Sequence, residues 1–284
     1  MDHDKEQALK RLALEIRIGA MTALGSLGFG HIGGAMSIAD TLAVLYGGVM
    51  RIRPEDPAWP DRDKFVCSKG HAGPSVYAVL AIKGYFPYED LTTLNKPGTN
   101  LPSHCDRNKT PGVDMTTGSL GQGASLAMGM ALGDKLKGRK NRVFLMLGDG
   151  EIDEGQVWEA AMFAAAKKLD NLTVFVDRNG KQLDGYTKDI LDTGDIAGKF
   201  AAFGFDTVDV ADGNDVAAVY EAVTAAGKRE GKPHCIVLHT VKGKGIPDVE
   251  QTMSNHSMNF KPGQADKWLE ELKRELSEMG GAQA

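Results

Sequence analysis

Two stretches of the sequence, VFLMLGDG at residues 143–150 and LTVFVDRN at residues 172–179, decide the fold. Each begins as a short, mostly apolar run, which is typical of a strand buried on both faces, and each ends in small or polar residues. The segment between them, residues 154–169, has the pattern of a helix. Because a strand, a helix and a second strand of this length form a crossover unit, the two strands are expected to run parallel.

The same alternation continues on both sides of this unit. Apolar runs at residues 64–67, 205–210 and 235–240 predict further strands, and the predicted helices are residues 37–45, 73–83, 121–136, 197–203 and 216–228. Strands that alternate with helices predict an α/β fold with a doubly wound, mostly parallel sheet and helices on both faces. We expect one domain over residues 1–284, with an N-terminal helix at about 5–24 and a peripheral C-terminal helix and tail at about 263–284.

Composition argues against several classes of protein. The chain has 284 residues, is 42% apolar and carries a net charge of −5 with no long basic run, so no nucleic-acid partner is expected. It has no stretch of about 18 uncharged apolar residues, so no membrane span is expected. The three cysteines, Cys67, Cys105 and Cys235, lie far apart without zinc or disulfide spacing, which favours a reducing cytoplasm.

Polar side chains follow the two strands that decide the fold. Asp149 comes after the first strand and Asn179 closes the second, and parallel strands place their carboxyl ends at one edge, where α/β sheets bind ligands. A carboxylate and an amide oxygen suit Mg²⁺, which takes its other ligands from phosphates and water. Gly148 and Gly150 let a phosphate approach, and the next helix offers free N–H groups to an anion. A single Gly-Asp-Gly is most often only a turn, but the two strand ends together predict a Mg²⁺–diphosphate site.

The same two segments carry a family resemblance. GDGEIDEGQ at residues 148–156 and DRNGKQLDG at residues 177–185 resemble the transketolase family, which implies a thiamine-diphosphate-binding fold. The resemblance implies that Asp149, Asn179 and the backbone carbonyl of Lys181 hold Mg²⁺. It also implies that Glu154 belongs to an acidic relay that links two cofactor sites across a dimer. The residues that it places around thiamine diphosphate are His71, Gly118, Ser119, Leu120, Gly148, Asp149, Gly150, Glu154, Asp177 and Asn179.

Four histidines lie on predicted loops or junctions: His31, His71, His104 and His256. Imidazoles around an α/β crevice suit proton transfer to and from hydroxyls and carbonyls near neutral pH. A zinc cluster is the alternative, although the four lack short ligand spacing. The resemblance extends to all four and implies catalytic roles. Ile32 replaces the family's usual proline after His31, which lies in a glycine-rich turn at residues 28–34. His256 lies in Asn-His-Ser where the family often has Trp-His-Gly.

The long loop predicted at residues 95–119 leads into a glycine-rich segment, GSLGQG at residues 118–123. Loops of this length in a compact domain are usually functional or disordered. The segment is not a dinucleotide-binding motif, because its spacing differs and no clear strand precedes it. In the transketolase interpretation Leu120 supports the rings of the cofactor, and a tight helix entry without ligand contact is the alternative.

The resemblance covers only the diphosphate-binding part of a transketolase. Full-length members continue into a pyrimidine-binding domain, which supplies a glutamate to the cofactor, and a C-terminal domain. We therefore expect a cytoplasmic two-chain enzyme, inactive without a C-terminal transketolase subunit, in an α₂β₂ assembly. The expected reaction transfers a two-carbon ketol unit from a ketose phosphate or an anionic analogue to an aldose.

Three alternatives to this function remain open from the sequence. Two are other thiamine-diphosphate enzymes, a deoxyxylulose-phosphate synthase or the α-chain of a 2-oxo acid dehydrogenase, and the third is a non-catalytic regulatory subunit. The four histidines favour sugar chemistry over the dehydrogenase. Donor and acceptor are left open, as are the anion and the role of His256.

Overall fold

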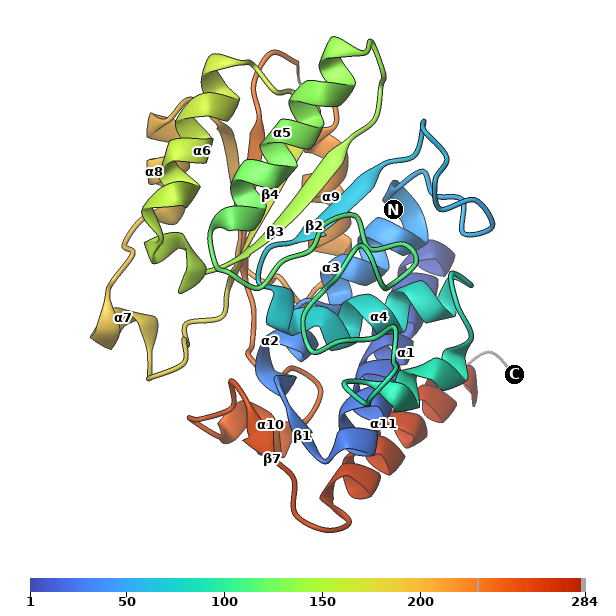
Figure 1. The fold of residues 1–284 in the computed structure, drawn as a ribbon. Helices are drawn as coiled ribbons and strands as arrows, with labels where there is room; N and C mark the ends of the chain where they lie inside the picture. Colours follow the sequence, from blue (N-terminus) through green and yellow to red (C-terminus); the bar gives the residue numbers. More distant parts are fainter. Residues whose placement is uncertain (229, 282–284) are drawn as a thin grey trace.

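The computed structural model describes residues 1–228 and 230–281, and a parallel sheet forms its centre (Figure 1). Within the described residues this sheet has five strands in the order β2-β3-β4-β6-β5, all parallel. The strands are β2 (Lys64–Cys67), β3 (Val143–Gly148), β4 (Leu172–Arg178), β5 (Asp206–Val210) and β6 (His234–His239). The predicted α/β fold is therefore confirmed.

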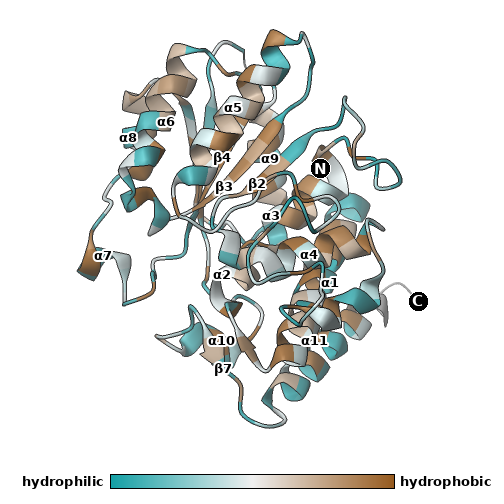
Figure 2. Ribbon diagram, in the orientation of Figure 1, coloured by the Kyte–Doolittle hydropathy of each residue, from teal (hydrophilic) through white to brown (hydrophobic). Residues whose placement is uncertain are grey.

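Alternate side chains of the strands enter two separate cores. Phe144, Met146 and Phe175 belong to one core, and Leu145 and Val174 belong to the other. The first core is covered by α1 (His3–Leu27), α3 (Ala39–Val44), α4 (Gly73–Ile82) and α9 (Val216–Ala226). The second is covered by α5 (Gln122–Leu136), α6 (Gly155–Ala166) and α8 (Ile196–Ala202). Because successive strand residues point to opposite faces, an almost continuous apolar sequence fills both cores (Figure 2).

The region after α1 differs from the predicted glycine-rich turn. Gly28 ends α1 with a φ of 83°, and β1 (Phe29–Gly30) follows. Helix α2 then begins at Ile32 and runs to Ser37, so Gly33 is buried inside a helix. A Cβ on Gly33 would lie 2.4 Å from the carbonyl oxygen of Asn255. This glycine therefore permits close packing instead of a turn.

Short elements and the C-terminal helix complete the described chain. The short helices are η1 (Leu45–Val49), η2 (Gly70–Ala72), η3 (Tyr88–Thr93), η4 (Glu151–Asp153), α7 (Thr187–Ile190) and α10 (Pro247–Gln251). β7 (Met258–Asn259) pairs antiparallel with β1. Helix α11 (Gln264–Gly281) lies against α1 at the edge of the molecule (Figure 1), yet Trp268 on it is fully buried. None of the described helices has the length and apolar character needed to cross a membrane.

Candidate functional site

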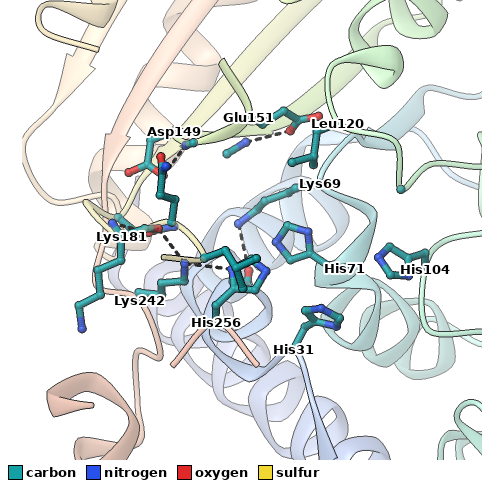
Figure 3. A pocket seen from close by; sticks show the side chains of 17 residues that line it. His31, Lys69, His71, His104, Leu120, Asp149, Glu151, Lys181, Lys242 and His256 are labelled. Atoms are coloured by element: carbon teal, nitrogen blue, oxygen red, sulfur yellow. Dashed lines mark hydrogen bonds between the residues drawn. The ribbon is translucent and has the colours of Figure 1, made fainter. Parts of the chain in front are cut away.

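A cavity of about 280 Å³ lies where the predicted residues were expected to meet, beyond the carboxyl ends of β2, β3 and β4 (Figure 3). Its wall includes most of the residues singled out from the sequence: His31, His71, His104, Gly118, Leu120, Gly148, Asp149, Gly150, Asn179, Lys181 and His256. Among the described residues that were also expected here, Ser119, Glu154 and Asp177 do not line it. The structure thus brings together parts of the chain that are more than 200 positions apart.

The strand register brings Asp149 and Asn179 to one place. Gly148 pairs with Asp177 across β3 and β4, so the next residues of both strands emerge at the same edge. Asp149 is 3% exposed, and its carboxylate accepts hydrogen bonds from the backbone N–H groups of Gly150 (2.9 Å) and Gly180 (2.6 Å). Asn179 Oδ1 accepts from the backbone N–H of Lys181 (3.2 Å). Asp149 and Asn179 therefore bring hard oxygens to one wall together with Lys181, whose carbonyl accepts a hydrogen bond from Lys242.

The surroundings of Asp149 disfavour the ionised form of its carboxylate. Its burial, together with the charge of Asp177, raises its pKa to about 6. The hydrogen bond from Gly180 and the ammonium groups of Lys242 and Lys69 oppose that shift. A divalent cation beside Asp149 would relieve the cost of burying its charge, so the donor set of this wall fits Mg²⁺.

Two buried lysines in the cavity wall were missed by the sequence interpretation. Lys69, 1% exposed, donates from Nζ to Asp177 Oδ2 (2.5 Å) and to the carbonyl of Gly34 (3.1 Å). Lys242, 4% exposed, donates from Nζ to the carbonyl of Lys181 (2.7 Å). Burial and the charge of Lys69 lower the pKa of Lys242 to about 8. Buried ammonium groups around one cavity suit an anion with several charges, so the cavity also fits a diphosphate.

A signal for both lysines was present in the sequence. Lys69 lies two residues before His71, and Lys242 begins the glycine-rich stretch KGKG at residues 242–245. Lysine is common on surfaces, however, and only the fold shows that these two are enclosed.

The four predicted histidines form one cluster. The ring centroid of His31 lies 5.4 Å from that of His71, 5.5 Å from that of His104 and 5.4 Å from that of His256. The centroids of His71 and His256 are 4.7 Å apart. They come from the start of α2, from η2 and from two loops, and Figure 3 shows them on the side of the cavity opposite Asp149. Within the described residues no three His, Cys, Asp or Glu side chains are grouped as they would be around a metal ion, so the zinc alternative gains no support.

The environment of the cluster favours neutral imidazoles. Burial lowers the pKa of His31, His71 and His104 below the ordinary value, and the nearby Lys69 further lowers that of His71. Burial and the charge of Lys242 lower the pKa of His256 to about 3. Neutral imidazoles have a free ring nitrogen, so they can accept a proton or a hydrogen bond from a sugar hydroxyl at neutral pH.

Two predicted residues lie near the cavity without lining it. Ser119 is exposed between Gly118 and Leu120. Glu154 is exposed at the start of α6, where a carboxylate can reach a neighbouring molecule. Its role in an acidic relay stays a prediction.

The carboxylate that does line the wall in this region is Glu151, which was not singled out from the sequence. It is 3% exposed and accepts hydrogen bonds from Ser68 Oγ and from the backbone N–H groups of Gly121 (2.9 Å) and Gly148 (3.1 Å). It therefore joins the loops after β2 and β3 to the start of α5.

Comparison with known proteins identifies the family of the chain. Residues 8–275 match the family model described as "Transketolase, thiamine diphosphate binding domain". The chain belongs to the transketolase family. It is 47% identical to a 6-deoxy-6-sulfo-D-fructose transketolase subunit of Clostridium sp., over 94% of this chain and 97% of that relative. It is 39% identical to an apulose-4-phosphate transketolase subunit of Actinobacillus succinogenes, over 94% of this chain and 95% of that relative.

Solved transketolases share the fold but are much longer. The transketolase from Leishmania mexicana superposes with a TM-score of 0.84 at 28% identity, covering 97% of this chain but 45% of that protein. Human transketolase is 37% identical over 95% of this chain and 43% of its own length. The match therefore spans nearly all of the Clostridium and Actinobacillus subunits, and less than half of these longer transketolases.

Proposed function

We propose that the protein is the thiamine-diphosphate-binding subunit of a two-chain transketolase, which transfers a two-carbon ketol unit from an anionic ketose to an aldose. The observation that carries this proposal is a single cavity in a transketolase-family chain. On one side it has the oxygen wall, formed by Asp149, Asn179 and Lys181, and on the other a cluster of four histidines. The first side suits Mg²⁺ and a diphosphate, and the second suits a polyhydroxylated substrate.

Some residues of the cavity would hold the cofactor, and others would transfer protons. Asp149, Asn179 and the Lys181 carbonyl would hold Mg²⁺, and Lys242 would neutralise part of the charge of the diphosphate. Thiamine diphosphate, when bound, supplies the electron sink that carbon–carbon bond cleavage requires. His31, His71, His104 and His256 would accept and return protons at substrate hydroxyls, and their mutual contacts would hold each ring in place.

The chain is proposed to need a partner. Two relatives that it matches almost end to end are named as subunits, and it spans 45% of the transketolase from Leishmania mexicana. The partner would carry the pyrimidine-binding domain and complete an α₂β₂ assembly, with exposed Glu154 in its acidic relay. The three cysteines are buried as free thiols, which supports a cytoplasmic location.

The substrate is proposed to be an anionic sugar. One relative is named for 6-deoxy-6-sulfo-D-fructose and another for apulose 4-phosphate, so the family includes both sulfonated and phosphorylated substrates. Both, together with common ketose phosphates, belong in the first screen.

The decisive experiment is purification from the native host followed by an assay of ketol transfer with thiamine diphosphate and Mg²⁺. The isolated chain is expected to be inactive, and the chain with its co-purified partner is expected to be active. Asp149→Ala should abolish Mg²⁺-dependent cofactor binding in calorimetry, and Asp209→Ala, outside the cavity, serves as its control. Full activity of the isolated chain would refute the need for a partner, and unchanged cofactor binding by the Asp149 variant would refute the metal site.

A further inference from the structure

One buried carboxylate beneath the cavity ties several of its walls together. Asp177 is fully buried. Its Oδ2 accepts hydrogen bonds from Ser37 Oγ (2.7 Å), Lys69 Nζ (2.5 Å) and Asn179 Nδ2 (2.7 Å), and its Oδ1 accepts one from Thr240 Oγ1. These donors come from the end of α2, the loop after β2, the residue after β4 and the residue after β6. Asp177 was expected to contact the cofactor, but the structure places it behind the wall.

The hydrogen bond to Asn179 fixes which end of that amide faces the cavity. Asp177 Oδ2 already accepts from the Lys69 ammonium, which can only donate, and Asn179 presents its NH₂ group to the same oxygen (2.7 Å). The amide oxygen then lies on the other side, where it accepts the N–H of Lys181 and adjoins the oxygen wall. If the amide were reversed, its NH₂ group would face the wall and repel a cation.

The side chains around Asp177 all point donors at it. Lys69 Nζ, which has no acceptor atom, forms a buried ion pair with Oδ2. Ser37, Asn179 and Thr240 supply the other hydrogen bonds to this carboxylate. These four contacts hold Asp177 in place behind the cavity wall.

We propose that Asp177 is a positioning residue that orients the amide of Asn179 so that its oxygen, and not its NH₂ group, faces the Mg²⁺ of the cofactor site. The inference rests on the proposed function, because it needs a divalent cation in the cavity. It goes beyond that function by assigning a role to a residue that never touches the cation. The competing explanation is that Asp177 only balances the charge of Lys69.

Three variants separate these explanations, each measured as Mg²⁺ affinity by calorimetry with saturating thiamine diphosphate, on the assembled protein. Asp177→Leu removes the acceptor, and Asp177→Asn keeps an amide oxygen that can accept from both Lys69 and Asn179. Lys69→Met removes the charge but leaves the hydrogen bond between Asp177 and Asn179. Loss of a partner that orients a metal ligand typically weakens metal binding by about 10- to 100-fold.

Asp177→Leu is therefore expected to weaken Mg²⁺ binding by about 10- to 100-fold, and Asp177→Asn by much less. Lys69→Met is expected to lose much less Mg²⁺ affinity than Asp177→Leu. The inference is overturned if the leucine and asparagine variants bind Mg²⁺ equally, or if Lys69→Met loses as much affinity as Asp177→Leu.

A fourth variant leaves the buried carboxylate untouched and so avoids a folding defect at Asp177. Asn179→Asp supplies a carboxylate, which is a common Mg²⁺ ligand, but it places that carboxylate against the acceptor-only Asp177. We expect weaker Mg²⁺ binding than in the wild type, and equal or tighter binding would overturn the inference. If the wild-type protein itself binds no Mg²⁺ with thiamine diphosphate, the proposed function fails instead.

Discussion

At the scale of single residues, the site depends on side chains that are enclosed before any ligand arrives. Glu151 shows this most directly, because donors from the loop after β2, the end of β3 and the start of α5 converge on its buried carboxylate. In Glu151→Gln the NH₂ end of the new amide must face an N–H group or the Ser68 hydroxyl, which leaves a buried donor unpaired. Such a loss costs about 1–3 kcal/mol of stability.

We therefore expect Glu151→Gln to lower the free energy of unfolding of the isolated chain in urea by about 1–3 kcal/mol. Glu159→Gln is the matched control, because Glu159 is exposed on α6 and should change stability by less than about 0.5 kcal/mol. Equal midpoints for the two variants would show that the Glu151 hydrogen bonds do not stabilise the fold.

His104 tests the division between cofactor binding and proton handling. It belongs to the histidine cluster but lies on the loop that precedes Gly118, away from the oxygen wall. His104→Ala is expected to lower the turnover of the assembled enzyme by about 100- to 10,000-fold, the usual contribution of a proton-transfer group. The affinity for thiamine diphosphate should change little.

The control for His104 is His239→Ala, which removes a half-exposed histidine that is paired with Asp209 outside the cavity. It should leave turnover near the wild-type value. A large loss of cofactor affinity in His104→Ala would contradict the assigned role of that residue.

At the scale of elements, helix α5 contains two glycines that have the same helical backbone conformation but opposite effects on stability. A Cβ on Gly123 would lie 2.3 Å from Ser68 Oγ and 2.7 Å from Ser68 Cα, whereas a Cβ on Gly129 would meet nothing within 4 Å. Gly123 therefore permits the start of α5 to approach the loop after β2. Gly129 only makes the helix more flexible.

Gly123→Ala should thus destabilise the isolated chain by about 1–3 kcal/mol through overpacking. Gly129→Ala, on the same helix, should stabilise it by about 0.5–1 kcal/mol, because alanine loses less conformational entropy on folding. Urea unfolding of both variants checks the pair. The packing argument fails if the two substitutions shift the unfolding midpoint in the same direction.

The elements also show what sequence patterns can and cannot predict. The apolar runs of β3 and β4 predicted their strands because burial on both faces leaves a local signature, and the crossover then placed Asp149 and Asn179 at one edge. For the glycines of α2 the predicted turn was wrong. A glycine that allows close contact with Asn255 cannot be told from the sequence apart from a glycine in a turn. The enclosure of Lys69 and Lys242 depends on contacts between distant segments, for which no local pattern exists.

At the scale of the whole molecule, the histidine cluster links the site to stability. His71 and His256 have pKa values below the ordinary one because burial disfavours their charged forms and Lys69 and Lys242 lie close. In the unfolded chain both would take up protons near pH 6.5. At these two groups the unfolded state therefore binds more protons than the folded state below that pH, so their contribution to the free energy of unfolding should fall as the pH drops from 7 to 5. Asp149 acts in the opposite direction, because its pKa is raised to about 6.

A comparison of variants isolates the contribution of the histidines from that of Asp149. His71→Asn/His256→Asn removes both groups, so its free energy of unfolding should fall less than that of the wild type between pH 7 and pH 5, in urea titrations without cofactor. His3→Asn, which removes a histidine at the exposed start of α1, should keep the pH dependence of the wild type. If the double variant and the wild type lose stability in parallel, the imidazoles are not held neutral by the fold. A substrate hydroxyl would then meet charged rings in the cavity, which could donate a proton but could not accept one.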